Sequence, residues 1–244
     1  MVDRNNYYSV SPAQKAEIDE GLRAYMLTVY NYMASALALT GLAAYVTANT
    51  PALLNLFYSV QGGMVAPTLL GYIVMFSPLA FVLALSFGVY RMQASTMQMV
   101  FWGFSVVMGL SLSNILLMYT GASVAKTFFI TAAAFGSLSL YGYTTRKNLS
   151  GFGSFLIMGL FGLIIASLVN LFMQSTMMDF VISVIGLLIF AGLTAYDTQR
   201  IKLMYLESDH SEIASKKAIM GALSLYLDFI NMFLYLLRFM GNRN

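Results

Sequence analysis

The chain has 244 residues, of which 59% are apolar and only 9% are charged, and its mean hydropathy is +0.74. A soluble domain carries about 25% charged residues, so this chain has too little charge to cover a surface in water. It has no cysteine and one histidine, which excludes disulfides, thiolate metal sites and sites built from several histidines. The net charge of +3 is small and the basic residues are scattered, so we expect no nucleic-acid partner.

Residues 1–23 are predicted to form a polar N-terminal segment in the cytoplasm. This segment is rich in charge and lacks the apolar core of a cleavable signal peptide. The run Ser11-Pro12-Ala13-Gln14 matches an N-cap, a proline at the first helical position and a glutamine at the reciprocal capping position. A polar helix is therefore expected to begin here and to continue into the first membrane span.

Residues 24–240 are predicted to form one domain, an all-α integral membrane protein with seven transmembrane helices. Its uncharged stretches have about the 20 residues that a helix needs to cross the hydrocarbon core. The stretch 24–90 must cross twice, and the turn signals Asn49-Thr50-Pro51 and Gln61-Gly62-Gly63 divide it. Only helices and closed barrels satisfy the backbone in lipid, and the alternation typical of a barrel is absent. The predicted spans are 25–48, 68–90, 97–119, 126–144, 154–174, 179–203 and 214–239.

The lysines and arginines indicate the orientation of the bundle. Ten fall on one side of the predicted topology, namely Arg4, Lys15, Arg23, Arg91, Arg146, Lys147, Arg200, Lys202, Lys216 and Lys217. Three fall on the other side, namely Lys126, Arg238 and Arg243. Because cytoplasmic loops are enriched in basic residues, the N-terminus is expected in the cytoplasm, and seven spans then place the C-terminus outside.

Two aspartates are the main candidates for a functional site, because ionisable groups inside a membrane are costly. Asp228 lies in the middle of the otherwise uncharged stretch 218–237, about 15 Å from either end at 1.5 Å per residue. Asp197 lies near the end of the sixth span. The sixth and seventh spans should form an antiparallel hairpin, which places the two carboxylates at similar depth. Both helices are apolar nearly all round, so the sequence does not say whether the carboxylates face each other.

If the carboxylates meet, they cannot both ionise easily at low dielectric, and the pair should titrate as a coupled unit. A shared proton would join the two helices, whereas the ionised pair would offer oxygen ligands suited to Ca²⁺. Arg91, at the cytoplasmic end of the second span, could pair with one carboxylate or simply extend to the interface. Asp228 could equally be a buried acid that only bonds a neighbouring helix, and Asp197 an acid in the headgroup region.

The hairpin resembles the signature of the Bax inhibitor-1 family, also called the transmembrane Bax inhibitor motif family. The resemblance rests on Ala195-Tyr196-Asp197-Thr198-Gln199 and on the stretch 223–231, which contains Leu-Tyr-Leu-Asp-Phe-Ile-Asn. It implies a bundle of seven helices with the last helix at the centre, wrapped by the other six, in the inner (plasma) membrane of a bacterium. For bacterial members it implies a pH-dependent Ca²⁺ leak with Asp197 and Asp228 as the regulatory pair. The gating arginine of the family would be Arg91.

The leading hypothesis is a pH-sensitive Ca²⁺ leak channel gated by the carboxylate pair, with lipid, Ca²⁺ and H⁺ as its partners and without a cofactor. The alternatives are an exchanger of H⁺ and Ca²⁺, or a regulatory protein that binds a membrane protease or another membrane complex. We expect no enzymatic activity and no catalytic residues. A retinal protein would need a lysine in the middle of the membrane, which the last three spans lack.

Overall fold

A computed structural model of the chain describes residues 12–61 and 64–242. Within this range the elements, in chain order, are α1 (Pro12–Asn49), α2 (Pro51–Phe57), β1 (Tyr58–Gln61), β2 (Met64–Pro67), α3 (Leu69–Gly88), α4 (Ala94–Met118), α5 (Gly121–Thr144), α6 (Ser150–Met173), α7 (Thr176–Met204) and α8 (Ser211–Met240). Seven of these helices, all except the short α2, are long and apolar enough to cross a membrane. This confirms the predicted all-α membrane fold. The prediction also used Arg4, Ser11, Gly62, Gly63 and Arg243, which lie outside the described residues.

Polar caps explain why two of the helices begin earlier than the predicted spans. Helix α5 begins at Gly121, where the Thr120 hydroxyl accepts a hydrogen bond from the Ser123 amide at 3.3 Å. Helix α7 likewise begins at Thr176, capped by the Ser175 hydroxyl. Such caps satisfy amides that have no partner within the helix, and they lie outside the apolar runs that mark the spans. Helix α1 runs without a break from Pro12 to Asn49.

The connection between α1 and α3 contains structure that the sequence prediction missed. After the short α2, strands β1 and β2 pair antiparallel, with Tyr58 opposite Pro67 and Gln61 opposite Met64. The Thr68 hydroxyl donates to the Leu56 carbonyl at 2.6 Å and joins the end of the hairpin to α2. The prediction treated Gln61-Gly62-Gly63 only as a turn, although glycine pairs between short runs of strand-forming residues are typical of β-hairpins.

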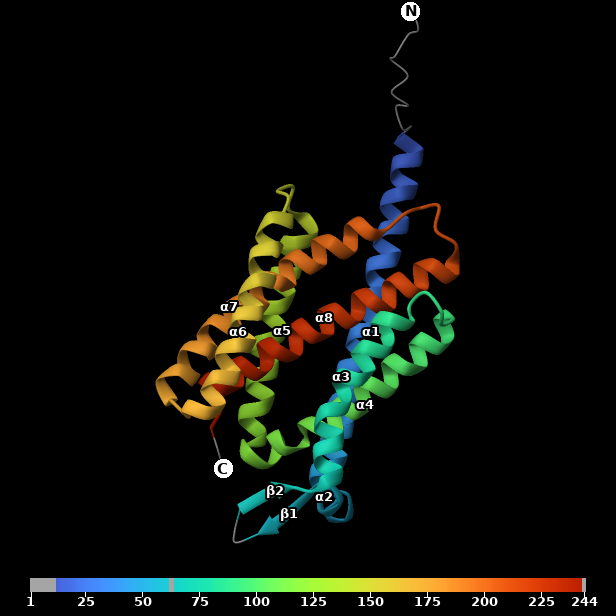
Figure 1. The fold of residues 1–244 in the computed structure, drawn as a ribbon. Coiled ribbons are helices and arrows are strands. Elements are labelled where there is room, and N and C mark those ends of the chain that lie inside the picture. The colour runs from blue at the N-terminus through green and yellow to red at the C-terminus, as the bar shows by residue number, and fades with distance from the viewer. Residues whose placement is uncertain (1–11, 62–63, 243–244) are drawn as a thin grey trace, which may run out of the picture.

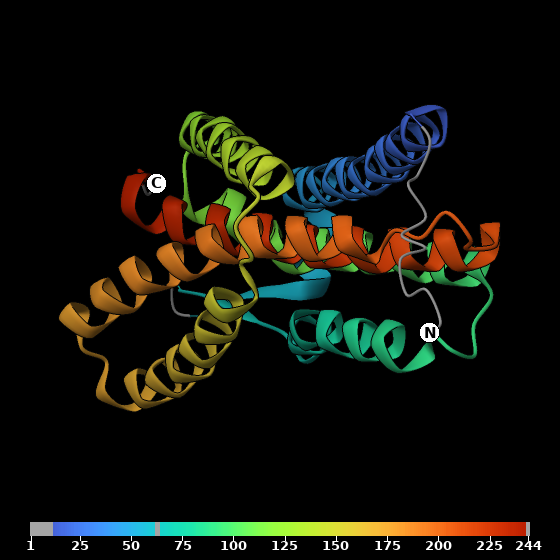
Figure 2. The ribbon, with the colours of Figure 1, turned by 90° about the horizontal axis from the view of Figure 1, so that it is seen from above.

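Helix α8 lies at the centre of the bundle. Figure 1 shows it crossing obliquely between α5, α6 and α7 on one side and α1, α3 and α4 on the other. Of the most apolar 18-residue stretch of α8, 61% is buried, compared with 11–33% of the corresponding stretch in each of the other six long helices. It packs against α7, α1, α5 and α4, whereas α3 packs against α4 and α6 against α7. Four helices therefore pack extensively on α8, and α3 and α6 occupy the outer positions seen in Figure 2.

Contacts between distant segments define the two ends of the bundle. At one end, which we call the N side, the Glu212 carboxylate accepts a hydrogen bond from the Ala94 amide at 2.7 Å. This places an acid at the positive end of the α4 dipole and holds the start of α8 beside the α3–α4 turn. At the opposite end, the C side, the Thr120 amide donates to the Asn242 carbonyl at 3.0 Å. The end of α8 is thereby held at the α4–α5 junction.

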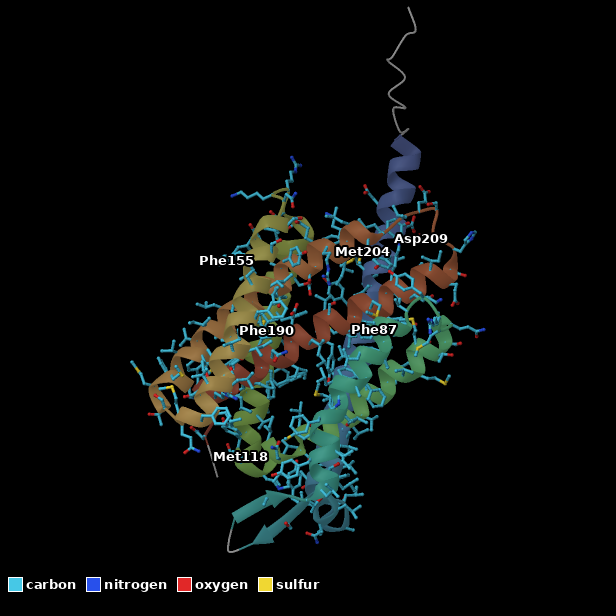
Figure 3. The ribbon with its side chains drawn as sticks, in the orientation of Figure 1. Phe87, Met118, Phe155, Phe190, Met204 and Asp209 are labelled. Carbon is cyan, nitrogen blue, oxygen red and sulfur yellow. The ribbon has the colours of Figure 1, made fainter. Side chains whose placement is uncertain are left out.

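Many large apolar side chains lie on the surface of the bundle. Phe87 on α3 and Phe155 on α6 are largely exposed, whereas Phe190 on α7 is buried (Figure 3). In water an apolar surface of this extent would drive association. Around a membrane protein it is the surface that contacts lipid.

Candidate functional site

The structure brings Asp197 of α7 and Asp228 of α8 together in the interior of the bundle. Both side chains are buried, and the two carboxylates are close enough for the charge of one to act on the other. One oxygen of Asp228, Oδ2, is fully buried and accepts no hydrogen bond among the described residues. A buried carboxylate oxygen without a partner is costly. The site is thus suited to take up a proton or a cation.

Arg200 is the basic residue that contacts the acid pair. Its Nη2 lies 3.3 Å from Oδ1 of Asp197, one helical turn away on the same face of α7. The same Nη2 donates to the Ser224 hydroxyl of α8 at 3.2 Å. The guanidinium also lies against the Tyr196 ring, 5.8 Å from its centroid. Arg200 therefore links α7 to α8 beside the aspartates, and its charge acts on Asp228 as well.

Arg91 lies elsewhere in the fold. It is exposed in the turn that follows α3 and forms no ion pair with the residues that the structure describes. The sequence prediction counted Arg200 only as a cytoplasmic charge and so missed its contact with Asp197. Its i, i+3 spacing from Asp197 was the available signal, because residues three apart are neighbours on a helix surface.

A chain of hydroxyl groups beside the acid pair joins α7 to α1 through α5. Thr198, next to Asp197 in the sequence, hydrogen-bonds Ser139 of α5 at 2.9 Å, and Ser139 bonds the Tyr30 hydroxyl of α1 at 2.6 Å. The Thr198 hydroxyl also lies 2.7 Å from the Thr194 carbonyl, where it can donate back to its own helix. These bonds connect three helices at the level of the acid pair, and each adds about 0.6 kcal/mol in a membrane.

Tyr226 makes a second buried polar contact, two residues before Asp228 on α8. Its hydroxyl lies 2.7 Å from the Thr40 hydroxyl, which in turn donates to the Ser105 carbonyl at 2.8 Å. Its ring meets the Phe104 ring edge-on at a centroid distance of 5.2 Å. Helices α1, α4 and α8 are thereby joined around a fully buried tyrosine.

Helices α5, α7 and α8 pack closely on the N side of the acid pair. A side chain at Gly221 of α8 would meet Ile201 of α7 at 3.0 Å, and a side chain at Gly142 of α5 would overlap the backbone at Ala195. Gln199 extends from α7 to the α5–α6 loop, where it accepts from the Leu149 amide at 2.8 Å. The end of α7 is therefore held on both sides.

The C side is more open. An ion pair joins Asp179 at the start of α7 to Arg238 near the end of α8, with 3.2 Å between Oδ1 and Nη1. Both residues line a cavity of about 590 Å³ beside α4 and another of about 340 Å³ beside α6. Leu234 lines the larger cavity, and it lies six residues, or about 9 Å of helix, beyond Asp228.

The acid pair alone is a sparse set of ligands for Ca²⁺. Among the described residues, no group of three or more acids or histidines is placed to hold a metal ion. Because Ca²⁺ takes six to eight oxygen ligands, Asp197 and Asp228 would supply only part of a coordination shell. Such an arrangement suits an ion that binds briefly and leaves, which conduction requires.

Comparison with known proteins places this chain among membrane proteins of bacteria. The family model described as inhibitor of apoptosis-promoting Bax1 matches residues 22–244. A protein of Rickettsia prowazekii is 49% identical over 100% of this chain and 99% of its own length. A protein of Caulobacter vibrioides is 48% identical over 99% of this chain and 98% of its own length. The inner membrane protein YbhL of Escherichia coli is 44% identical over 91% of this chain and 93% of its own length. Together with its seven spans, these matches show that the chain is a multi-pass inner-membrane protein that belongs to the Bax inhibitor-1 family.

Proposed function

We propose that the protein is a pH-sensitive leak channel for Ca²⁺ and that Asp197 and Asp228 form its gate. The observation that carries the proposal is the burial of two interacting carboxylates in the middle of the bundle with an unpaired Oδ2 on Asp228. Such a pair is costly to keep in a membrane, and ionisable groups that are retained there mark functional sites. A proton shared between the carboxylates would close the site, and a cation could replace it.

Arg200 is the third part of the proposed gate. Its guanidinium holds Asp197 and Ser224, and so it joins the two helices that carry the acid pair. A cation that enters from the N side must compete with this charge for Asp197. Because 40% of the Arg200 side chain is exposed, the guanidinium can move into water without crossing the core.

The cavities around Asp179 and Arg238 supply an entrance on the C side. Between the larger cavity and Asp228, α8 presents the buried apolar residues Phe229, Ile230, Met232 and Phe233. About 9 Å of helix, apolar except for Asn231, therefore separates this entrance from the acid pair. A barrier of this thickness is in keeping with a closed state and a slow leak. In the proposal the N side faces the cytoplasm, as the basic residues indicate.

The experiment measures Ca²⁺ entry into liposomes that contain the purified protein and an internal Ca²⁺ indicator. With a Ca²⁺ gradient alone, the proposal predicts passive entry that changes between about pH 5 and about pH 8, the range in which biological proton switches operate. Protein-free liposomes set the background. A second arm imposes a proton gradient without a Ca²⁺ gradient. Net Ca²⁺ accumulation in that arm would contradict a passive leak and identify an exchanger, and absence of entry in both arms would refute ion transport.

A further inference from the structure

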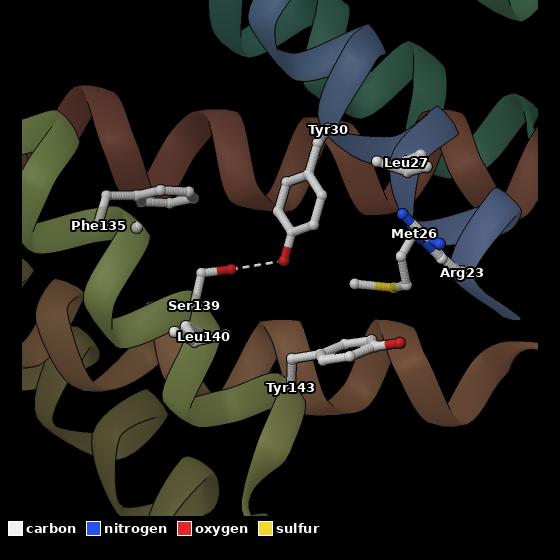
Figure 4. A pocket seen from close by; sticks show the side chains of 9 residues that line it. Arg23, Met26, Leu27, Tyr30, Phe135, Ser139, Leu140 and Tyr143 are labelled. Atoms are coloured by element: carbon white, nitrogen blue, oxygen red, sulfur yellow. Dashed lines mark hydrogen bonds between the residues drawn. The ribbon is translucent and has the colours of Figure 1, made fainter. Parts of the chain in front are cut away.

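A groove separates α1 from α5 along the side of the bundle. Helix α1 packs on α4 and α8, and α5 packs on α7 and α8, whereas α1 and α5 scarcely contact each other. Between them lies a cavity of about 480 Å³, shown in Figure 4. The hydrogen bond from Tyr30 to Ser139 crosses it. Cavities of this volume are in the range of small-ligand sites.

The lining of this cavity combines apolar walls with one cation. Met26 and Leu27 of α1 face Phe135 and Leu140 of α5 across the space (Figure 4). Arg23 lies at the N-side end and is exposed. It forms no ion pair with any side chain that the structure describes. An apolar slot with an unpaired cation at its mouth is complementary to an amphiphile whose headgroup is negative.

The groove continues toward the C side. A second cavity of about 220 Å³ lies farther along the same two helices, with Leu37 and Gly41 on α1 and Val124 and Phe128 on α5. From Arg23 to Gly41 the axis of α1 rises by about 27 Å, close to the thickness of the hydrocarbon core of a bilayer, about 30 Å. The first cavity, from Arg23 to Tyr30, covers about 10 Å of that depth. It therefore lies in the leaflet on the N side.

The geometry points to a binding site for an anionic phospholipid of the N-side leaflet, with one acyl chain in the groove between α1 and α5 and its phosphate at Arg23. The acyl chain would lie against Ser139, which is hydrogen-bonded to Thr198, and against Tyr30, which is hydrogen-bonded to Ser139. This lipid site does not depend on the proposed Ca²⁺ leak, and it can be tested without measuring ion flux.

The test measures phospholipid binding to the delipidated protein by native mass spectrometry, with phosphatidylglycerol and phosphatidylcholine as probes. The wild-type protein should retain one phosphatidylglycerol in preference to phosphatidylcholine. Arg23→Gln should reduce that preference about fivefold, the effect of one basic residue at an anionic headgroup. Arg146→Gln is the charge control, because Arg146 is exposed in the α5–α6 loop on the same side and does not line the cavity.

A second variant blocks the groove and leaves Arg23 in place. A side chain at Gly136 would meet nothing within 4 Å, so Gly136→Leu extends into the cavity that this residue lines and should abolish retention. Gly162→Leu on α6 is the matched control, because that position is equally open and is remote from the groove. Equal binding of both lipids by the wild-type protein would overturn the proposal. Retention by Gly136→Leu equal to that by Gly162→Leu would also overturn it.

Discussion

Replacing Arg200 by glutamine is predicted to increase the Ca²⁺ leak. The change removes the ion pair with Asp197 and weakens the link to Ser224, while a shorter, uncharged amide remains in place. Two effects act in the same direction. The cation that competes with Ca²⁺ for Asp197 is lost, and α7 and α8 are less firmly joined beside the acid pair.

The magnitude follows from the geometry of the ion pair. Unit charges at the observed 3.3 Å attract by about 5 kcal/mol at an effective dielectric constant of about 20. Because 40% of the Arg200 side chain is exposed, screening and loss of side-chain freedom reduce this to about 1–2 kcal/mol. A change of that size in the closed state corresponds to an increase of about 5- to 30-fold in the open population.

The assay compares initial rates of Ca²⁺ entry into liposomes at one pH and one protein density. Arg146→Gln is the control for loss of a basic residue on the same side, and it should leave the rate unchanged. Arg91→Gln measures the gating role that the family resemblance implies for Arg91. An unchanged or lower rate in Arg200→Gln would refute the assignment of Arg200 to the gate.

The remaining predictions concern packing and hydrogen bonds around the site. The Thr40 hydroxyl has one hydrogen, which it donates to the Ser105 carbonyl, so the Tyr226 hydroxyl must donate to Thr40. Thr40→Val strands a buried donor and should cost about 1–3 kcal/mol, whereas Tyr226→Phe removes that donor and should cost about 0.6 kcal/mol. Thermal unfolding in detergent measures both, and a reversed order would contradict the assigned direction. Gly142→Val forces α5 away from the backbone of α7 and should lower the yield of folded protein. Gly162→Val is the control, because this position is in open space, and it should leave the yield unchanged. Equal yields of the two variants would show that the close approach of α5 and α7 is dispensable.

Much of the fold was predictable, because the bilayer imposes a simple rule on the sequence. Long uncharged runs must be helices of sufficient length, and the seven spans were found on that basis. The ends of the helices were less predictable, because residues such as Thr120 and Ser175 cap a helix from outside its apolar run. The β-hairpin was missed because its short strands carry a much weaker sequence signal than a membrane span does.

The candidate site was predictable in part. The depth of Asp197 and Asp228 followed from counting along an antiparallel hairpin, and the structure places the two side chains together. The face on which each lies was not predictable, because helices that are apolar all round give no directional signal. The contact of Arg200 with Ser224 depends on how α7 and α8 pack. The groove between α1 and α5 depends on which helices do not pack, and neither follows from one-dimensional spacing.

The most direct test of the proposed gate is the pH dependence of Ca²⁺ entry in Asp197→Asn and Asp228→Asn. Asparagine keeps the shape of the side chain and removes its titration. Each variant therefore abolishes the shared proton and leaves one carboxylate to titrate alone, so its pH dependence should no longer match that of the wild-type protein. Asp179→Asn is the matched control, since Asp179 lies in the C-side ion pair with Arg238, and it should retain the pH dependence. Entry that still varies with pH, as in the wild type, in both Asp197→Asn and Asp228→Asn would contradict the account.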